Sequence, residues 1–344
     1  MILREEDDGG RAMVMSDDER KSPLNIASSL SFTDIVQLLI DNNADIESRN
    51  NEGHTSLYNA VLGEHNDTVT LLIERGADVN AQRYNGVSPL MAACYMGMLD
   101  TVKLLLKHDS KVNLQDSDGR TPLYHASCNG HIAVVKELLA THADGNLTEN
   151  NSINCQMTDD FDGHTDVVCA LESGGADVNL QNNDGFSPLI VASQEGHTDI
   201  VKLLVHNGAE IEIRSDKRTT PLHLAAYKGR IEVVQFLIEH HADVNACDSG
   251  GESCLLLAVF GGHTDVVHAL VSAGADVNLQ RNDGNSPLII ASQEGHTDIV
   301  KLLVDNRAKI ETGNNKGATA LYLAASNGCV EVVQFLIEHH ADEY

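Results

Sequence analysis

Basic residues are scarce in this chain. Its 344 residues include 23 Lys and Arg against 51 Asp and Glu, which gives a formal net charge of -28. Phosphate groups repel a surface rich in carboxylates, so we expect no nucleic-acid partner. The same charge disfavours binding to an anionic membrane surface. It favours a protein partner with a basic surface, because the acidic field speeds the approach of such a partner at low salt.

Long apolar runs are absent as well. No stretch approaches the ~20 residues that a membrane-spanning helix requires, and residues 1–8 lack the hydrophobic core of a secretion signal. The seven cysteines form no Cys-x-x-Cys pair, and their number is odd. These features predict no membrane insertion, reduced thiols, and a location in the cytoplasm or the nucleus.

Catalytic motifs are missing too. The sequence contains no phosphate-binding glycine loop, no dinucleotide fingerprint, no His-Glu-x-x-His and no Gly-x-Ser-x-Gly. Ser, His and Asp are plentiful, but nothing indicates a strained nucleophile turn or an oxyanion hole. We therefore predict no enzymatic activity, no catalytic residue and no cofactor.

What the chain does contain is a period of 33 residues. Valine recurs at every step from Val36 to Val333, and leucine at every step from Leu39 to Leu336, with no insertion or deletion. A fixed period of this length is typical of a solenoid, in which each repeat buries its apolar face against its neighbours.

Residues 219–245 illustrate one repeat. Thr220 is a good helix N-cap and Pro221 suits the first helical turn. Gly229 stops this first helix, and a second apolar pattern runs from Ile231 to His241. Two helices of this length cannot bury their own apolar faces, so they need neighbours.

The repeat resembles a known family. Thr-Pro-Leu-His-Leu-Ala at 220–225 and Gly-Ala-Asp-Val-Asn at 175–179 and 274–278 are similar to the ankyrin repeat. The resemblance covers about ten repeats and implies an all-α ankyrin-repeat solenoid of stacked helix-turn-helix units with projecting hairpin loops. We expect residues 1–21 to form a flexible or capping tail and residues 22–344 to form the array.

Two positions in each repeat predict a left-handed backbone. A glycine recurs at the expected hairpin tips. These glycines are Gly53, Gly86, Gly119, Gly185, Gly251, Gly284 and Gly317. The residue that ends the second helix is Gly, Asn, Asp or His in every repeat but one. The exception is Arg307, where we expect backbone strain.

The repeat at 152–184 departs from the pattern. Gln156 and Asp159 stand where other repeats have leucine and alanine, and burying an unpaired carboxylate would cost several kcal/mol. We expect residues 152–161 to be displaced while a second helix over 166–173 keeps the stack continuous. Strong hydrogen-exchange protection of 155–161 would contradict this expectation.

The second half of the chain contains a longer period. Residues 185–205 recur with two differences at 284–304, and residues 232–243 recur unchanged at 331–342. This pattern indicates a duplicated block of three repeats. The last repeat keeps the apolar Val333 and Leu336, so we expect it to be uncapped. A fragment of a longer protein, a covering segment, or self-association through this end would each account for it.

The histidines do not predict a metal site. Five share one register, and equivalent positions lie one repeat apart, roughly 10 Å in stacked helices. These five are His131, His164, His197, His263 and His296. We expect each to close the turn between two helices by hydrogen bonding.

The resemblance places partner contacts at the hairpin tips and at the exposed end of the first helix. Several aromatic residues fall on these positions, and exposed aromatics in a row are typical of a partner site. The predicted partner-binding residues are Arg83, Tyr84, Tyr95, Met96, Arg120, Phe186, Tyr227 and Phe260. Arg83 and Arg120 would anchor partner carboxylates. Phe161 shares the register but lies in the degenerate repeat. Alternatively, Tyr227 and its equivalents pack on the neighbouring helix.

The sequence thus predicts a non-catalytic protein–protein interaction scaffold or adaptor that binds partner proteins on a concave ankyrin surface. The alternative is a regulatory or substrate-recruiting fragment of a larger signalling protein, such as a kinase, a channel or a ubiquitin-ligase receptor. Asn80 and Asn245 also resemble the asparagine that is sometimes hydroxylated in this family. The simpler interpretation is a loop asparagine that bonds its own backbone.

Overall fold

The protein is described by a computed structural model that covers residues 22–148, 163–339 and 341. The chain divides into two compact units, Met1–Ser117 and Asp118–Tyr344. The predicted tail (1–21), the displaced segment (152–161) with Phe161, and His340 lie outside the described residues.

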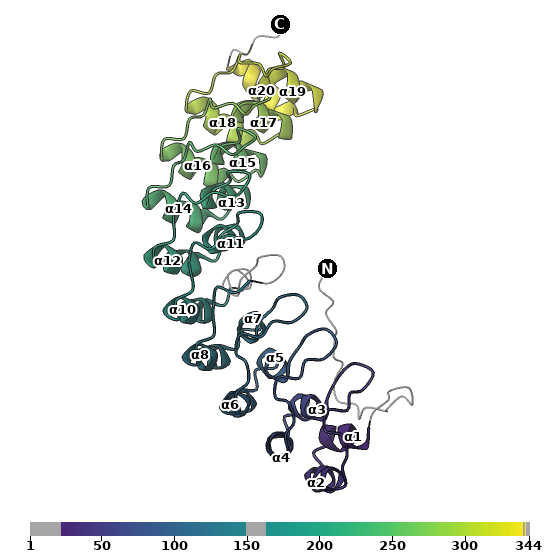
Figure 1. Cartoon of the computed structure of the whole chain (residues 1–344). Helices are drawn as coiled ribbons and strands as arrows, with labels where there is room; N and C mark the ends of the chain where they lie inside the picture. Colours follow the sequence, from purple (N-terminus) through teal and green to yellow (C-terminus); the bar gives the residue numbers. More distant parts are fainter. Residues whose placement is uncertain (1–21, 149–162, 340, 342–344) are drawn as a thin grey trace. The chain divides into compact units, whose positions relative to one another are not determined.

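The described part of the first unit consists of three helix pairs. The helices are α1 (Pro23–Ser29), α2 (Thr33–Asp41), α3 (Ser56–Leu62), α4 (Asn66–Glu74), α5 (Pro89–Tyr95) and α6 (Leu99–Lys107). The first helices α1, α3 and α5 pack in sequence, and the second helices α2, α4 and α6 form a parallel row (Figure 1). Each pair therefore contacts only the pairs before and after it.

The second unit continues the same arrangement. Its described helices are α7 (Pro122–Ser127), α8 (Ile132–Ala140), α10 (Thr165–Ser173), α11 (Pro188–Glu195), α12 (Thr198–His206), α13 (Pro221–Tyr227), α14 (Ile231–Glu239), α15 (Cys254–Phe260), α16 (Thr264–Ser272), α17 (Pro287–Glu294), α18 (Thr297–Asp305), α19 (Ala320–Ser326) and α20 (Val330–Glu338). Helix α10 packs on both α8 and α12. The second helix of the degenerate repeat thus continues the row, one residue longer than predicted.

Each first helix begins at a Ser or Thr N-cap. The hydroxyl of Ser88 accepts a hydrogen bond from Met91 N at 3.2 Å, and that of Ser253 accepts one from Leu256 N at 3.3 Å. Such caps satisfy backbone donors that a helix cannot satisfy internally, and each contributes about 1 kcal/mol. At the predicted cap Thr220 the hydroxyl instead lies 2.7 Å from His223 Nδ1.

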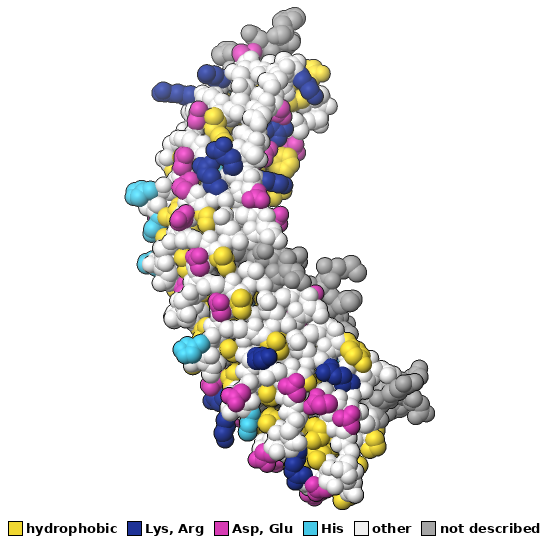
Figure 2. All heavy atoms as spheres, viewed as in Figure 1, with side chains coloured by type: hydrophobic (Ala, Val, Ile, Leu, Met, Phe, Trp, Pro, Cys, Tyr) yellow, Lys and Arg dark blue, Asp and Glu magenta, His cyan; other side chains and the backbone are white. Residues whose placement is uncertain are grey.

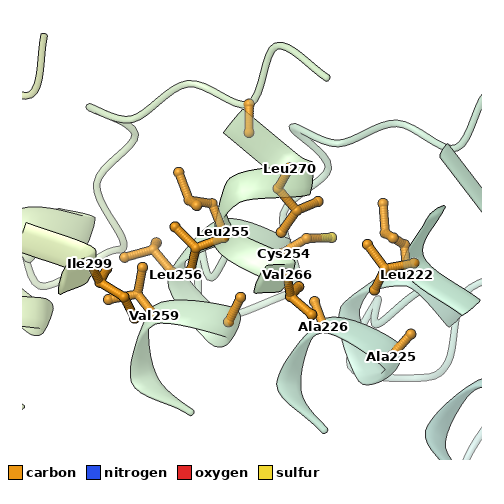
Figure 3. Packing of buried hydrophobic residues seen from close by; sticks show 14 of the residues in the cluster. Leu222, Ala225, Ala226, Cys254, Leu255, Leu256, Val259, Val266, Leu270 and Ile299 are labelled. Carbon is orange, nitrogen blue, oxygen red and sulfur yellow. The ribbon is translucent and has the colours of Figure 1, made fainter. Parts of the chain in front are cut away.

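The core follows the 33-residue period. The periodic valines from Val36 to Val300 and the periodic leucines from Leu72 to Leu336 are fully buried in the described repeats. Figure 3 shows Ala226 of α13 beside the larger Val266 of α16, and Val259 of α15 beside Ile299 of α18. Small residues on one helix let the next helix approach closely, so the stack is dense.

The hairpin tips also stack on one another. Gly185 and Gly251 have φ of 75°, and a Cβ on Gly185 would lie 2.6 Å from the backbone nitrogen of Asp216 in the next tip. That nitrogen donates to Asp184 O at 3.1 Å. The tips therefore need glycine for two reasons, a left-handed backbone and a close approach.

The ends of the second helices match the prediction. All nine described positions of this register have positive φ, including Arg307 at 70°. Helix α14 ends at Glu239 rather than at His241, because His241 itself adopts the left-handed conformation, with φ of 68°.

Candidate partner-binding surface

The predicted contact residues of the first unit lie around α5. Tyr84 at the tip is 70% exposed, and Tyr95 and Met96 at the end of α5 are 57% and 46% exposed. These three side chains have not been buried by the neighbouring repeat. They can contact a partner without any rearrangement of the core.

Arg83, in contrast, is engaged within its own unit. Its Nε donates to Asn85 Oδ1 at 2.7 Å, and its guanidinium lies 5.9 Å from the centroid of the Tyr58 ring. Its Nη1 is 3.4 Å from His54 Nε2. Tyr58 is buried, which raises the pKa of its hydroxyl. Arg83 therefore supports the loop within its own unit, and its role as an anchor for partner carboxylates stays a prediction.

Two predicted residues of the second unit are also partly engaged. Arg120 forms an ion pair with Asp118. Phe186 is half-buried, and its backbone nitrogen donates to Asn182 Oδ1 at 2.9 Å. Both follow a tip glycine, where the chain turns back toward the first helix. Both residues are only partly exposed.

Tyr227 and Phe260 flank a pocket on the second unit. They end α13 and α15 and are 38% and 52% exposed. The pocket has a volume of about 360 Å³. Its lining residues come from three repeats: Thr219, Leu224, Tyr227, Asp248, Glu252, Leu256, Leu257, Phe260, Arg281 and Ile290. First helices supply an apolar floor, and the loops supply a polar rim.

The rim carries an ion-pair network. Arg281 Nη1 lies 3.1 Å from Glu252 Oε1, and Arg281 Nη2 lies 2.6 Å from Asp283 Oδ2. The hydrogen bond from Arg281 holds the pKa of Asp283 below its usual value, and the same bond raises the pKa of Arg281. The three side chains thus fix one another in place.

Sequence reasoning missed this network, although a signal was present. Arg281 occupies a loop register where Asn182 and Asn314 accept two backbone hydrogen bonds each and so close the loop. An arginine cannot make these bonds, and Asp283 accepts one from Asn285 N instead. Arg83 occupies the same register as Arg281. An alignment of the loop sequences alone would therefore have shown these two arginines as exceptions to the loop-closing asparagine.

A second hollow adjoins the pocket on the side of α19. It has a volume of about 620 Å³ and shares Arg281 with the first. Its lining also includes Asp283, Asn314, Lys316 and Tyr322. Together the two hollows are lined by residues of α13, α15, α17 and α19 and of their loops. On the visible face of each unit, acidic and basic side chains are interspersed, with no continuous basic area (Figure 2).

His263 has a different role from the one predicted for its register, and His65 of the same register shares that role. His263 Nε2 lies 3.0 Å from the carbonyl oxygen of Tyr227, and His65 Nε2 lies 3.1 Å from that of Ser29. These carbonyls end the first helix of the preceding repeat. The two histidines therefore link neighbouring repeats instead of closing their own turn, and His263 supports the end of α13 beside the pocket.

Asn245 also bonds across repeats. Its Oδ1 accepts from Asp276 N at 2.8 Å, and its Nδ2 donates to Gly274 O at 3.3 Å. The interpretation as an asparagine that bonds its own backbone is therefore wrong for its side-chain amide. Asn80 likewise accepts from Lys111 N at 2.8 Å.

Other kinds of site were sought in the described ranges 22–148, 163–339 and 341. No group of three or more His, Cys, Asp and Glu there could hold a metal ion. No helix in the same ranges is long and apolar enough to cross a membrane. The six described cysteines carry free thiols, and burial raises the pKa of Cys94 and Cys254.

The fold and the surface together define an all-α solenoid that presents loops and first helices on one side. A family model that describes three copies of the ankyrin repeat matches four stretches of the chain, residues 9–83, 81–149, 157–248 and 255–344. The chain therefore belongs to the ankyrin-repeat family. A search of curated proteins gave no match. Ankyrin repeats generally bind other proteins and are typically not catalytic.

Proposed function

We propose that this protein is a non-catalytic scaffold or adaptor that binds partner proteins on the surface formed by its hairpin tips and first helices. The observation that carries the proposal is the pair of exposed aromatic residues, Tyr227 and Phe260, on either side of an apolar-floored pocket. Exposed aromatic side chains beside a pocket are typical binding hot spots. A rigid array also loses little conformational freedom when it binds.

Affinity capture from a cell lysate, followed by mass spectrometry, tests the proposal. One bait is the native chain, a second carries Tyr227→Ala and Phe260→Ala, and a third carries Tyr84→Ala and Tyr95→Ala. Phe32→Ala is the matched control, because Phe32 is an exposed aromatic residue at the start of α2 and not at a tip or first-helix end. Circular dichroism must first show that all four baits are folded.

We expect a partner that the native chain and the Phe32 variant retain and that one of the double variants loses. Whichever double variant loses it identifies the unit that carries the contact. A set of captured proteins that is the same for all four baits would contradict the proposal.

The proposal places the protein in the cytoplasm or the nucleus, where free thiols persist. The free thiols of Cys169 and Cys247 support this placement, because neither is deeply buried. Microscopy of a fluorescent fusion checks it, and secretion of the fusion would contradict it.

A further inference from the structure

We propose that the pocket between α13 and α15 receives a long basic side chain, lysine or arginine, from an extended segment of the partner protein. This inference rests on the proposed function and adds the chemistry of the residue that is recognised. It is carried by the side chains that share the pocket: two carboxylates at the rim above an aliphatic and aromatic floor.

The floor suits the aliphatic stem of such a side chain. Leu224, Leu256, Leu257 and Ile290 supply aliphatic surface to the pocket, whose volume is about 360 Å³. Lysine and arginine bury their methylene groups along apolar surface and keep the charged group at the edge. The Tyr227 ring beside the pocket already attracts an ammonium group, since Lys228 Nζ lies 5.5 Å from its centroid.

The rim supplies the negative charge. Asp248 Oδ1 accepts from Gly250 N at 2.8 Å and from Glu252 N at 2.9 Å, so its carboxylate is held in one position. Glu252 is held by Arg281, whose own charge is offset by Glu252 and Asp283. The pocket lining therefore has two carboxylates, Asp248 and Glu252, against one guanidinium, and Asp283 adds a third carboxylate from the adjoining hollow. Lys316 lies farther along, in the adjoining hollow.

The other occupants fit less well. An acidic side chain would meet the negative charges of Asp248 and Glu252, and the charge of Arg281 is already offset by Glu252 and Asp283. A purely apolar side chain would desolvate the two rim carboxylates and give them no countercharge, which is costly. A basic side chain with an aliphatic stem satisfies both parts of the pocket.

One substitution at the rim, Asp248→Asn, removes a negative charge and keeps the hydrogen bonds that hold the loop. Asn182 and Asn314 occupy the register of Asp248 and accept the same pair of backbone hydrogen bonds, at 2.9 to 3.0 Å. Asp248→Asn should therefore fold like the native protein. Asp216→Asn is the matched control, because Asp216 is an exposed tip aspartate of the neighbouring loop that does not line the pocket.

The test begins with a random-peptide phage library panned on the full chain. We expect the enriched peptides to share a lysine or arginine at one fixed position. A synthetic lysine peptide from this set is then measured by fluorescence polarisation, beside the same peptide with acetyl-lysine. Acetylation and Asp248→Asn should each weaken binding by about tenfold, while Asp216→Asn should leave it unchanged.

The outcomes separate this inference from the proposed function. Enriched peptides that lack a shared basic residue, but lose binding to the Tyr227→Ala and Phe260→Ala variant, would overturn the inference and leave the function standing. Equal binding of the lysine and acetyl-lysine peptides would also overturn the inference and leave the proposed function standing. Peptides that bind the aromatic variant as well as the native chain, or no enriched peptide at all, would count against both.

Discussion

At the scale of the residue, the array tolerates side chains in a conformation that favours glycine. Arg307 lies just after α18, which ends at Asp305, and has φ of 70°, while Gly208 and Gly274 in the same register have φ of 91° and 92°. A Cβ at these glycines would meet nothing within 4 Å. The strain at Arg307 is therefore a backbone cost and not a steric clash with a neighbour.

Arg307→Gly should stabilise the protein. The left-handed conformation costs an ordinary residue roughly 1–2 kcal/mol, and part of the gain is lost because glycine is more flexible in the unfolded chain. We expect a net gain of about 0.5–1 kcal/mol. Urea unfolding followed by circular dichroism measures it. The reciprocal change Gly274→Arg should lower stability by a similar amount, and a less stable Arg307→Gly protein would refute the strain.

Single residues also mark the limit of what the sequence predicts. The period alone places Val201 and Leu204 in the core and gives Arg307 its left-handed backbone, because both follow from register. It cannot place the ion pairs of Arg281, since these depend on Glu252 in one loop and Asp283 in another. Side-chain choices in loops are not constrained by the hydrophobic pattern, so their contacts need coordinates.

At the scale of the element, helix α10 carries an unusual residue. Glu172 stands where the neighbouring second helices have Leu139, Val205 and Ile238. Its Oε2 accepts from Asn207 Nδ2 at 2.5 Å, but Oε1 is buried with no hydrogen-bond partner among the described residues. Burial raises the pKa of Glu172 despite the bond to Asn207. The packing of α10 therefore favours the protonated form.

Glu172→Gln should stabilise the protein at pH 7 and not at low pH. A raised pKa in the folded state means that the charged form carries a cost, which is absent below the unfolded pKa and complete above the folded one. Because the side chain is half-exposed, solvent screening limits the gain to about 0.5 kcal/mol. Urea unfolding at pH 7 and near pH 4 measures it.

The control for this prediction is Glu210→Gln, at an exposed position in a loop. Its effect on stability should be small and should not change with pH in the way that Glu172→Gln does. A gain for Glu172→Gln that is equal at both pH values would show that charge burial is not its cause.

At the scale of the whole molecule, stability depends on contacts between adjacent repeats. Helix α14 packs on α12, α13 and α16, and the later helices repeat the pattern up to α18 and α20. Backbone hydrogen bonds between tips, such as Ser249 N to Lys217 O at 2.9 Å, also join adjacent repeats. The second unit therefore resembles a one-dimensional chain, in which a local defect weakens its own repeat and those beside it.

Leu237→Ala should reveal this behaviour. Leu237 is fully buried in α14, and its truncation should cost roughly 2–5 kcal/mol. Hydrogen exchange with mass spectrometry should show the largest loss of protection in α12, α13, α14 and α16 and little change in α20.

Leu336→Ala is the matched control, because Leu336 is the equivalent buried leucine three repeats later. It should move the loosened region to α18, α19 and α20, since the defect then lies at the other end of the row. If both variants loosened every helix of the second unit to the same extent, the unit would unfold as one cooperative body. A partner bound near Tyr227 would then sense changes throughout the unit rather than only in the repeats that it contacts.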